Sequence, residues 1–468
     1  MKLKKTLACM LAIFFVIGFM LAGDNSRGIT PDVLKILKNS VNVNSPRTRA
    51  LINAVSANDV SKLVINKGVK DRLFDRNFSF ELKTRGVTNQ KNSGRCWLFA
   101  GLNILRYRVA RRLNLKKFEL SQSYNFFYDK LEKANLFLEK IIETRNRPIT
   151  DRTVDFLLKH PIPDGGQWNM VVDLVNKYGV VPGEVMPETY NTSNTRRINQ
   201  LLATLLRKDA AILRESGKDE KELRKMKIEM LKDVYRLLVY AFGQPPEQFK
   251  WRYKDSSGKL SPWKTYTPQS FFREFINVDL NDYVVIYNCP ARKYYRLYSI
   301  SLDRDMADRQ DLTFINLPID EVKKLTLKTL IETKEPVWFG CDVGKELLNK
   351  EGIMAPDVYD YNSLLGIDFA MTKRQRILYR HSIPTHAMVF TGVDLDASGK
   401  PVKWLVENSW GSKVGKNGMY VMYDKWFDYY LYEVVIPGKN LSPELQKILK
   451  QKPEVVPPWD PMYDFFSH

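Results

Sequence analysis

Histidine and cysteine are both scarce in this chain of 468 residues, which contains four of each. Neither a Cys-x-x-Cys nor a His-Glu-x-x-His motif occurs, and these spacings are typical of structural and catalytic zinc sites. The sequence therefore predicts no metal site and no cofactor.

Long apolar runs are also missing, except at the N-terminus. Lysines at positions 2, 4 and 5 precede a continuous apolar run from Leu7 to Ala22, which is the pattern of an export signal. Met20 and Leu21 make a poor cleavage site ahead of Gly23, so the segment can also stay as a membrane anchor. We therefore expect an exported protein, in the periplasm, the cell envelope or the medium, that is membrane-anchored if residues 1–23 are retained.

Acidic residues are fewer than basic ones, 53 against 73, which gives a formal net charge of +20. Such a surplus attracts nucleic acid or anionic surfaces. The basic residues are scattered, however, and residues 218–224 carry both signs in one run. An ordinary solvated surface is the favoured interpretation, and a nucleic-acid partner is only weakly supported.

Three cysteines remain outside the apolar N-terminal run, and they form no close pair in the sequence. Cys289 and Cys341 both lie in apolar, strand-like runs. They could form a disulfide after export, or remain as buried free thiols.

Cys96 is predicted to lie at the start of a helix. Apolar residues follow it at steps of three and four, which mark one face of an α-helix: Leu98, Leu102, Leu105, Val109 and Leu113. Ser93 is a plausible N-cap, and the positive end of the helix favours a thiolate. The side-chain amide of Gln90, with the Cys96 backbone N–H, could hold a developing oxyanion. The alternative is an inert core cysteine.

A thiolate nucleophile needs an imidazole to hold its proton, and His386 is the best candidate. It opens a strand-like run that continues to Val393, whereas His160, His381 and His468 have less rigid contexts. Asn408, at the end of the next strand-like run, could fix the imidazole tautomer, and Trp410 could shield that hydrogen bond. Taken singly, these residues are better explained as a core histidine, a turn former and a packing residue.

The remaining chain reads as helical in its first half and mostly as strands in its last third. Helices are predicted over about 121–145 and 196–242, and a hairpin between Trp251 and Tyr266. Buried strands are expected at 284–287, 337–341, 386–393, 401–406, 418–423 and 429–436. The motif at 164–168 contains Gly165 and Gly166, which suit either a tight turn or an edge that pairs with an extended peptide.

Four motifs together resemble the papain-like cysteine peptidases. They are Gln90, Gly94-x-Cys96-Trp97, Thr385-His386-Ala387 and Asn408-Ser409-Trp410-Gly411. Cys96 and His386 are 290 positions apart, about twice the roughly 130–150 positions usual for that family, which indicates a large insert. The sequences of residues 87–97, 164–168, 339–345 and 458–462 resemble those of the bleomycin hydrolase and aminopeptidase C branch of this family.

This resemblance implies an α+β, papain-like fold with a helical left lobe, a β-barrel-like right lobe, an inserted helical domain and a C-terminal arm. The domains expected from it are a leader or anchor at 1–23, an N-terminal arm at 24–75, the nucleophile lobe at 76–195, the insert at 196–335, the β-rich lobe at 336–452 and the C-terminal arm at 453–468. It also implies a homohexamer with active sites facing a central channel.

The resemblance further implies a thiol aminopeptidase that acts on peptides. Cys96 would attack, His386 act as base and acid, Asn408 orient it, and Gln90 form the oxyanion hole. The residues expected to bind substrate are Gly165, Gly166, Trp410 and His468, the last through the terminal carboxylate of the C-terminal arm.

Three features depart from the family pattern. Ser93 replaces the first cysteine of the usual Cys-Gly-x-Cys-Trp motif, so the local disulfide of secreted papains is absent. The leader is unexpected, because characterised members of this branch are mostly cytosolic. The segment after Met462 is bulkier than the usual ending, which leaves a papain-type endopeptidase open as an alternative. The basic charge leaves a second alternative, a nucleic-acid- or surface-binding protein that keeps the fold.

Overall fold

The computed structural model describes residues 27–463 and divides them into two units. The first unit contains the chain up to Ile65 together with Tyr359–Phe369, and the second contains Asn66–Val358 and the chain from Ala370 onward. The predicted leader, residues 1–23, and the terminal segment from Asp464 to His468 lie outside the described residues.

The first unit consists of short helices whose starts are fixed by side-chain caps. The helices are α2 (Pro31–Asn39), α3 (Pro46–Ala57), α4 (Val60–Leu63) and α15 (Tyr361–Leu365). Thr30 and Ser45 cap α2 and α3, and each cap is followed by a proline at the first helical position, where a missing N–H costs nothing. An isolated bridge between Ile65 and Tyr359 joins the two segments of the unit, a pairing that the sequence did not predict.

The helical part of the second unit surrounds α6 (Cys96–Arg112). Residues from Cys96 to Tyr107 are all buried, because α6 packs between α7, α9 and strand β10. The other helices of this part are α5 (Lys67–Lys70), α7 (Gln122–Glu143), α8 (Arg152–Lys159) and α9 (Trp168–Tyr178), of which α7 and α9 pack against α6. The predicted helix at 121–145 corresponds to α7, with the Ser121 hydroxyl accepting a hydrogen bond from the backbone N–H of Tyr124 at its start.

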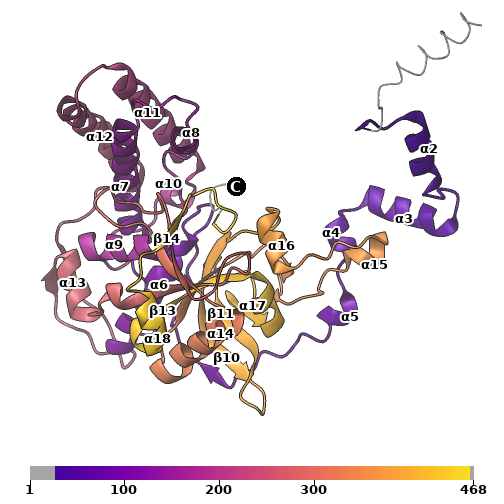
Figure 1. Cartoon of the computed structure of the whole chain (residues 1–468). Coiled ribbons are helices and arrows are strands. Elements are labelled where there is room, and N and C mark those ends of the chain that lie inside the picture. The colour runs from indigo at the N-terminus through magenta and orange to yellow at the C-terminus, as the bar shows by residue number, and fades with distance from the viewer. Residues whose placement is uncertain (1–26, 464–468) are drawn as a thin grey trace, which may run out of the picture. The chain divides into compact units, whose positions relative to one another are not determined.

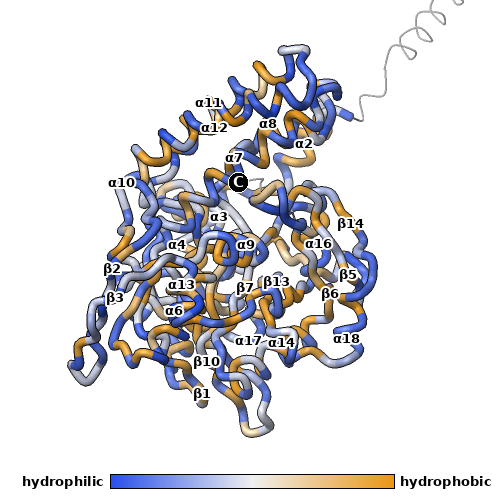
Figure 2. Tube along the Cα trace, turned by 90° about the vertical axis from the view of Figure 1, so that its left-hand side faces the viewer, coloured by the Kyte–Doolittle hydropathy of each residue, from blue (hydrophilic) through white to orange (hydrophobic). Residues whose placement is uncertain are grey.

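The region predicted to be an insert contains a helical pair that lies beside α7 (Figure 1). The sequence predicted a helical stretch over 196–242, and the structure divides it into α11 (Arg196–Glu215) and α12 (Glu220–Phe242). The break occurs at Gly217, which has φ +65°, a conformation that glycine adopts without strain. Apolar and polar positions alternate along both helices (Figure 2), and the inward residues of α11 recur at helical spacing: Ile198, Leu202, Leu206, Ala210 and Leu213.

Short elements complete the second unit. Strands β2 (Phe249–Trp251) and β3 (Lys264–Tyr266) form the predicted hairpin. The other elements are α10 (Tyr190–Ser193), α13 (Pro268–Phe275), η2 (Leu280–Asp282), α14 (Ile319–Lys328), η3 (Thr329–Thr333), α16 (Lys373–Leu378), α17 (Asp424–Tyr430), η4 (Gly438–Asn440) and α18 (Pro443–Ile448).

One large mixed sheet contains β1 and all the strands from β4 to β14. Its strands follow the order β14-β5-β6-β4-β13-β7-β10-β11-β12-β9-β8, with β1 paired to β10. Their bounds are β1 (Phe80–Glu81), β4 (Tyr283–Tyr287), β5 (Arg296–Ile300), β6 (Thr313–Asn316), β7 (Val337–Cys341), β8 (Leu347–Leu348), β9 (Ile353–Met354), β10 (His386–Leu395), β11 (Pro401–Glu407), β12 (Met419–Tyr423), β13 (Leu431–Pro437) and β14 (Glu454–Val456). The strand predicted from residue 429 begins two residues later, because Tyr429 and Tyr430 complete α17.

The central strands are buried on both faces. Trp338 and Val389 face the core shared with α6, whereas Phe339 and Phe390 face a second core on the other side of the sheet. This alternation follows from the period of two along a strand. The predicted α+β class is confirmed. Within residues 27–463, we find no helix that is both long enough and apolar enough to cross a membrane.

Candidate active site

A cleft of about 620 Å³ in the second unit brings together residues that are far apart in the sequence. Its lining includes five residues predicted for the site or its motifs, which are Gln90, Gly94, Cys96, Gly165 and His386. Loop 159–164, the exposed turns of α11 and residues 383–385 complete the lining. The cleft therefore lies where α6, α11 and the start of strand β10 converge.

Cys96 is the first residue of α6, but its loop is not built as the sequence predicted. The N-cap position belongs to Arg95, which has no side-chain cap. Ser93 instead donates its hydroxyl to the backbone oxygen of Gln90 at 2.6 Å and accepts from Arg95 Nε at 2.9 Å. The prediction that Ser93 caps the helix is therefore wrong, because its hydroxyl closes the loop that precedes the helix.

The Cys96 thiol is almost completely buried, with 5% of the residue exposed. Burial raises the pKa of the thiol to about 11, and backbone N–H groups of Ala387, Trp97 and Cys96 oppose this shift. The help expected from the start of the helix is present but is outweighed by the cost of burying a charge. The neutral thiol is therefore favoured.

His386 begins strand β10, and its ring is held by Asn408, which follows β11. His386 Nε2 lies 2.8 Å from Asn408 Oδ1. The backbone N–H of Ser409 donates to the same oxygen at 2.7 Å, so this atom is an acceptor and His386 Nε2 must be the donor. The neutral ring therefore carries its proton on Nε2, which leaves Nδ1 as an acceptor.

Burial also controls the charge of His386. It lowers the pKa of the imidazole to about 4, and the hydrogen bond to Asn408 works in the opposite direction. Trp410 packs against the imidazole, with 4.7 Å between the ring centroids. The tryptophan thus covers the His386 ring, as expected of a residue that shields the hydrogen bond to Asn408.

The Gln90 side chain is fixed by hydrogen bonds at both ends of its amide. Its Oε1 accepts from the Ser409 hydroxyl at 2.6 Å, and its Nε2 donates to the Ser93 backbone oxygen at 2.7 Å. An amide nitrogen carries two hydrogens, so one donor remains for the cleft that Gln90 and Cys96 both line. Sequence reasoning missed Ser409, whose position directly after Asn408 was the available signal.

The two predicted substrate-binding glycines occupy different positions. Gly165 lines the cleft, and its carbonyl accepts a hydrogen bond from Lys133 Nζ at 2.7 Å. Gly166 is buried behind it, where an added Cβ would come within 2.6 Å of the Trp97 indole. A side chain at position 166 would therefore force the backbone of Gly165 and Gly166 away from α6.

Asp164, beside Gly165, is a charged residue of the cleft that sequence reasoning missed. It forms an ion pair of 2.7 Å with Lys130 and accepts from the backbone N–H of Gly94, from Asn199 Nδ2 and from the Thr195 hydroxyl. Burial opposes the charge, but Lys130 and the hydrogen bonds outweigh it and hold the pKa of Asp164 well below its usual range.

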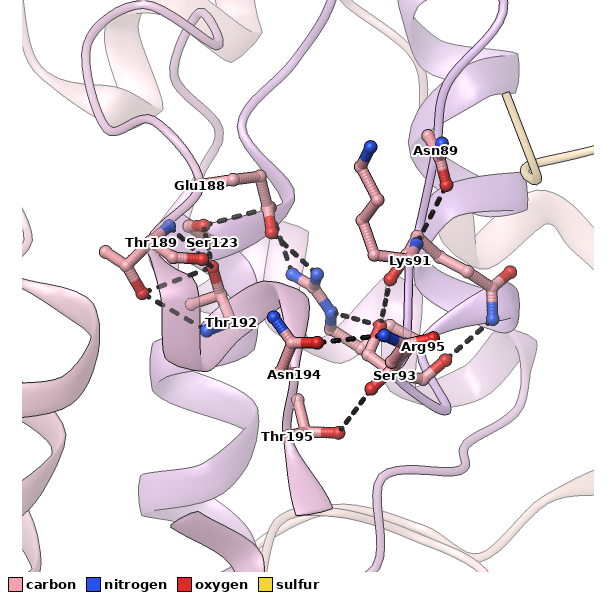
Figure 3. A network of polar contacts seen from close by, with 12 residues as sticks. Asn89, Lys91, Ser93, Arg95, Ser123, Glu188, Thr189, Thr192, Asn194 and Thr195 are labelled. Atoms are coloured by element: carbon pink, nitrogen blue, oxygen red, sulfur yellow. Dashed lines mark hydrogen bonds and ion pairs between the residues drawn. The ribbon is translucent and has the colours of Figure 1, made fainter. Parts of the chain in front are cut away.

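A second ion pair joins Glu188 to Arg95, the residue directly before Cys96 (Figure 3). Arg95 is fully buried and binds Glu188 through two hydrogen bonds of 3.0 and 2.6 Å. Its guanidinium lies 5.0 Å from the centroid of the Phe99 ring and 4.9 Å from that of Phe126. Ser123 donates to the same carboxylate at 2.9 Å. The sequence offered no signal for this pair, because its partners are 93 positions apart.

Three further predictions concern residues away from the catalytic group. Cys289 and Cys341 are buried free thiols, so of the two possibilities left open by the sequence the structure has the unpaired one. His160 also lines the cleft. His468, expected to bind substrate, lies outside the described residues.

The chain matches known proteins along most of its length. The model of the peptidase C1-like family matches residues 28–463. Aminopeptidase C of Streptococcus thermophilus is 42% identical over 418 residues, covering 88% of this chain and 94% of that protein. Aminopeptidase G of Lactobacillus delbrueckii subsp. lactis is 41% identical over 424 residues, covering 90% and 96%.

A solved structure agrees with these relatives. The crystal structure of PepW from Lactobacillus rhamnosis superposes with a TM-score of 0.89 at 42% identity, covering 93% of this chain and 99% of that one. The predicted papain-like fold and the resemblance to the aminopeptidase C branch are confirmed.

The same relatives contradict the predicted location. Aminopeptidases C are typically intracellular enzymes of bacteria, so the expectation of an exported or membrane-anchored protein is wrong. That expectation rested on a short run of charged and apolar residues, a pattern that can arise without acting as a leader. Residues 1–23, which carry the pattern, lie outside the described part of the chain.

Proposed function

Because the chain belongs to the peptidase C1-like family, we propose that it releases N-terminal amino acids from peptides through an acyl-enzyme formed on Cys96. That it is a papain-like cysteine aminopeptidase follows from its relatives. The roles of Cys96, His386 and Asn408 are the proposed part. The observation that carries them is the cleft shared by Cys96 and His386, with His386 Nε2 bonded to Asn408.

In acylation, the Cys96 proton moves to Nδ1 of His386 as the sulfur attacks the substrate. The sulfur attacks the carbonyl carbon of the first peptide bond, and the carbonyl oxygen becomes an oxyanion. The free N–H of Gln90 and the backbone N–H of Cys96 bind that oxyanion. When the tetrahedral intermediate collapses, the C–N bond breaks, His386 returns the proton to the leaving amine, and a thioester remains on Cys96.

Deacylation uses the same groups in reverse. His386 takes a proton from a water molecule, the resulting hydroxide attacks the thioester, and the free amino acid leaves as the Cys96 thiol regains its proton. Because burial favours neutral Cys96 and neutral His386, proton transfer accompanies the attack instead of preceding it. Asn408 stabilises the imidazolium that forms, through the oxygen that already accepts from Nε2.

Restriction to N-termini requires an anion that binds the substrate's ammonium group. Asp164 is the sole carboxylate among the described residues that line the cleft, and its oxygens are already bonded to Lys130, Gly94, Thr195 and Asn199. This supports the role predicted for the C-terminal arm. Tyr463 is fully buried, and the five residues after it can span about 17 Å, so the His468 carboxylate remains our proposed receptor.

The proposed partners are peptides and further copies of this chain in a homohexamer. The nucleic-acid alternative receives no added support, because many surface cations of the insert pair with neighbouring carboxylates, as Lys225 does with Glu222 and Lys232 with Glu229. A papain-type endopeptidase would use the same thiol chemistry but would also cut peptides with blocked N-termini.

The proposal is tested by replacing Cys96 with alanine and assaying one peptide with free and acetylated N-termini. We expect Cys96→Ala to abolish release of amino acids from the free peptide, and the unmodified protein to leave the acetylated peptide intact. Cys289→Ala, which removes a buried thiol outside the cleft lining, should retain activity. Undiminished turnover by Cys96→Ala would refute the proposed mechanism, and cleavage of the acetylated peptide would establish the endopeptidase alternative.

A further inference from the structure

Asp164 joins three separate segments of the second unit at the edge of the cleft. Its Oδ2 accepts from the Gly94 backbone N–H at 3.1 Å and from the Thr195 hydroxyl. Its Oδ1 accepts from Asn199 Nδ2 at 2.6 Å and contacts Lys130 Nζ at 2.7 Å. The donors belong to the loop before Cys96, the start of α11, and α7, so one carboxylate bonds all three.

The loop before Cys96 is placed against these partners at close range. An added Cβ at Gly94 would lie 2.7 Å from the Asp164 Cβ, so glycine is required where these two segments of the chain approach each other. The same loop also pairs with the segment before α11. The backbone N–H of Asn92 donates to the Ser193 oxygen at 2.9 Å, and that of Thr195 donates to the Asn92 oxygen at 3.2 Å.

Helix α11 is itself one wall of the cleft. The residues that it contributes to the lining, beyond Asn199, are Gln200, Ala203, Thr204 and Arg207. Arg207 also donates to the backbone oxygen of Leu158 at 2.9 Å, which links this wall to the end of α8. A shift of α11 relative to the nucleophile loop would therefore change which peptides fit beside Cys96.

We propose that Asp164 is a positioning residue that fixes the nucleophile loop and the α11 wall relative to each other, so that it sets both the reactivity of Cys96 and the fit of the peptide. This inference rests on the proposed function of Cys96. It adds that residues of the helical insert, which never touch the sulfur, select the substrate through their attachment to Asp164.

Two other roles for Asp164 are less consistent with its surroundings. A receptor for the substrate's ammonium group would need an unoccupied oxygen, whereas both oxygens already have two partners. If Asp164 and Lys130 served stability alone, apolar side chains of similar volume would do as well. A buried ion pair rarely stabilises the fold more than well-packed apolar residues do. A carboxylate that binds several segments gives orientation in addition to stability.

The test uses two variants that remove different interactions of Asp164. Asp164→Asn keeps the shape of the side chain but removes acceptor capacity and charge, and we expect kcat/KM for peptides to fall about tenfold to a hundredfold, the scale of a misplaced reacting group. Alkylation of Cys96 by iodoacetamide, a small reagent that does not need the peptide site, should slow as well. Both effects arise because the loop and the wall are released together.

Thr195→Val removes one of the two hydrogen bonds between the start of α11 and Asp164, and leaves the one from Asn199 in place. We expect iodoacetamide to react with Cys96 at an unchanged rate, while KM for a pentapeptide rises several-fold and KM for an aminoacyl amide, which does not reach along α11, stays the same. Lys227→Met is the matched control, because Lys227 pairs with Glu139 between α12 and α7 and does not line the cleft. It should lower thermal stability without changing the ratio of the two KM values.

Two results would overturn the inference. One is that correctly folded Asp164→Asn and Thr195→Val proteins show unchanged alkylation and unchanged KM ratios. The other is that both variants lose activity on all substrates in the same proportion as Lys227→Met. These results differ from failure of the proposed function, which would appear as full activity in Cys96→Ala.

Discussion

The two sides of the cleft are held in place by different forces. On the sheet side, His386 and Asn408 sit at ends of adjacent strands, and β10 is paired along its length with β7 and β11. On the helix side, Cys96 follows a loop that ion pairs fix to distant segments, through Arg95 with Glu188 and Asp164 with Lys130.

This difference determines how each side should respond to substitution. Backbone hydrogen bonds between strands fix the position of the first residue of a strand, whatever its side chain is. Substitutions on the sheet side should therefore remove catalytic groups without changing the backbone structure. A loop held by side-chain ion pairs has no such support. Changes behind the nucleophile should therefore alter stability and geometry together.

The largest effect is expected from His386→Ala, which removes the base from the sheet side. The protein should fold normally, because β10 keeps its backbone pairing, while kcat falls by on the order of 10³-fold or more, as when one member of a coupled catalytic group is lost. Steady-state kinetics on an unblocked peptide and circular dichroism measure the two quantities. His381→Ala is the control, since His381 is exposed and does not line the cleft, and its kcat should match the original. Retained turnover in His386→Ala would exclude the histidine as the base.

The same contrast explains which features of the site could be predicted from the sequence. The helix that begins at Cys96 and the strand that begins at His386 follow from apolar periods of 3.6 and 2, which are local properties. The structure has both elements, as α6 and β10. Asn408 was found for the same reason, as a polar residue at the end of a predicted strand.

The ion pairs could not be predicted, because they join residues across long stretches of chain. The sequence around Arg95 does not indicate that this residue forms an ion pair with Glu188. The sequence around Asp164 does not indicate that Thr195 and Asn199 donate hydrogen bonds to it. Ser93 illustrates the limit, since its local context is typical of an N-cap, whereas its hydroxyl bonds Gln90 and Arg95. A local rule failed there because tertiary partners offered the hydroxyl better hydrogen bonds.

A smaller effect is expected from Glu188→Gln on the helix side. Arg95 would remain buried without a counter-charge, which costs several kcal/mol in a fully buried site. The Glu188 side chain is 30% exposed, so solvent screens part of this cost and we expect a loss of about 2 kcal/mol in the free energy of unfolding. Urea denaturation measures it.

Glu229→Gln is the matched control for this change. Glu229 pairs with Lys232 on the surface of α12, with side chains 70% and 60% exposed, and such pairs contribute about 0–1 kcal/mol. Equal stability losses in the two variants would show that the pair behind the nucleophile is not special. A larger loss in Glu188→Gln, together with slower alkylation of Cys96, would confirm that charge fixes this side.

A pH-dependent effect is expected from Glu433, a buried acid of β13 on the sheet side. Gly340 on β7 leaves room for it, since an added Cβ there would lie 2.5 Å from Glu433 Oε1. Burial and, secondarily, the charge of Asp303 raise the pKa of Glu433 to about 8, from the usual 4.5, against the effect of a hydrogen bond from Gln167. Unlike Asp164, this carboxyl is therefore neutral in the folded protein near pH 7.

The sign of the pH effect follows from that shift. Between about pH 4.5 and 8 the folded protein holds a proton on Glu433 that the unfolded chain releases, so this group lowers stability by up to about 1.4 kcal/mol per pH unit as the pH rises. Glu433→Gln cannot titrate, and its Tm relative to the original protein should therefore be higher at pH 8 than at pH 5. Thermal melts at both values measure the difference. A Tm difference that is the same at pH 5 and pH 8 would show that Glu433 is ionised in the fold, and that the sheet side also contains a stabilised buried charge.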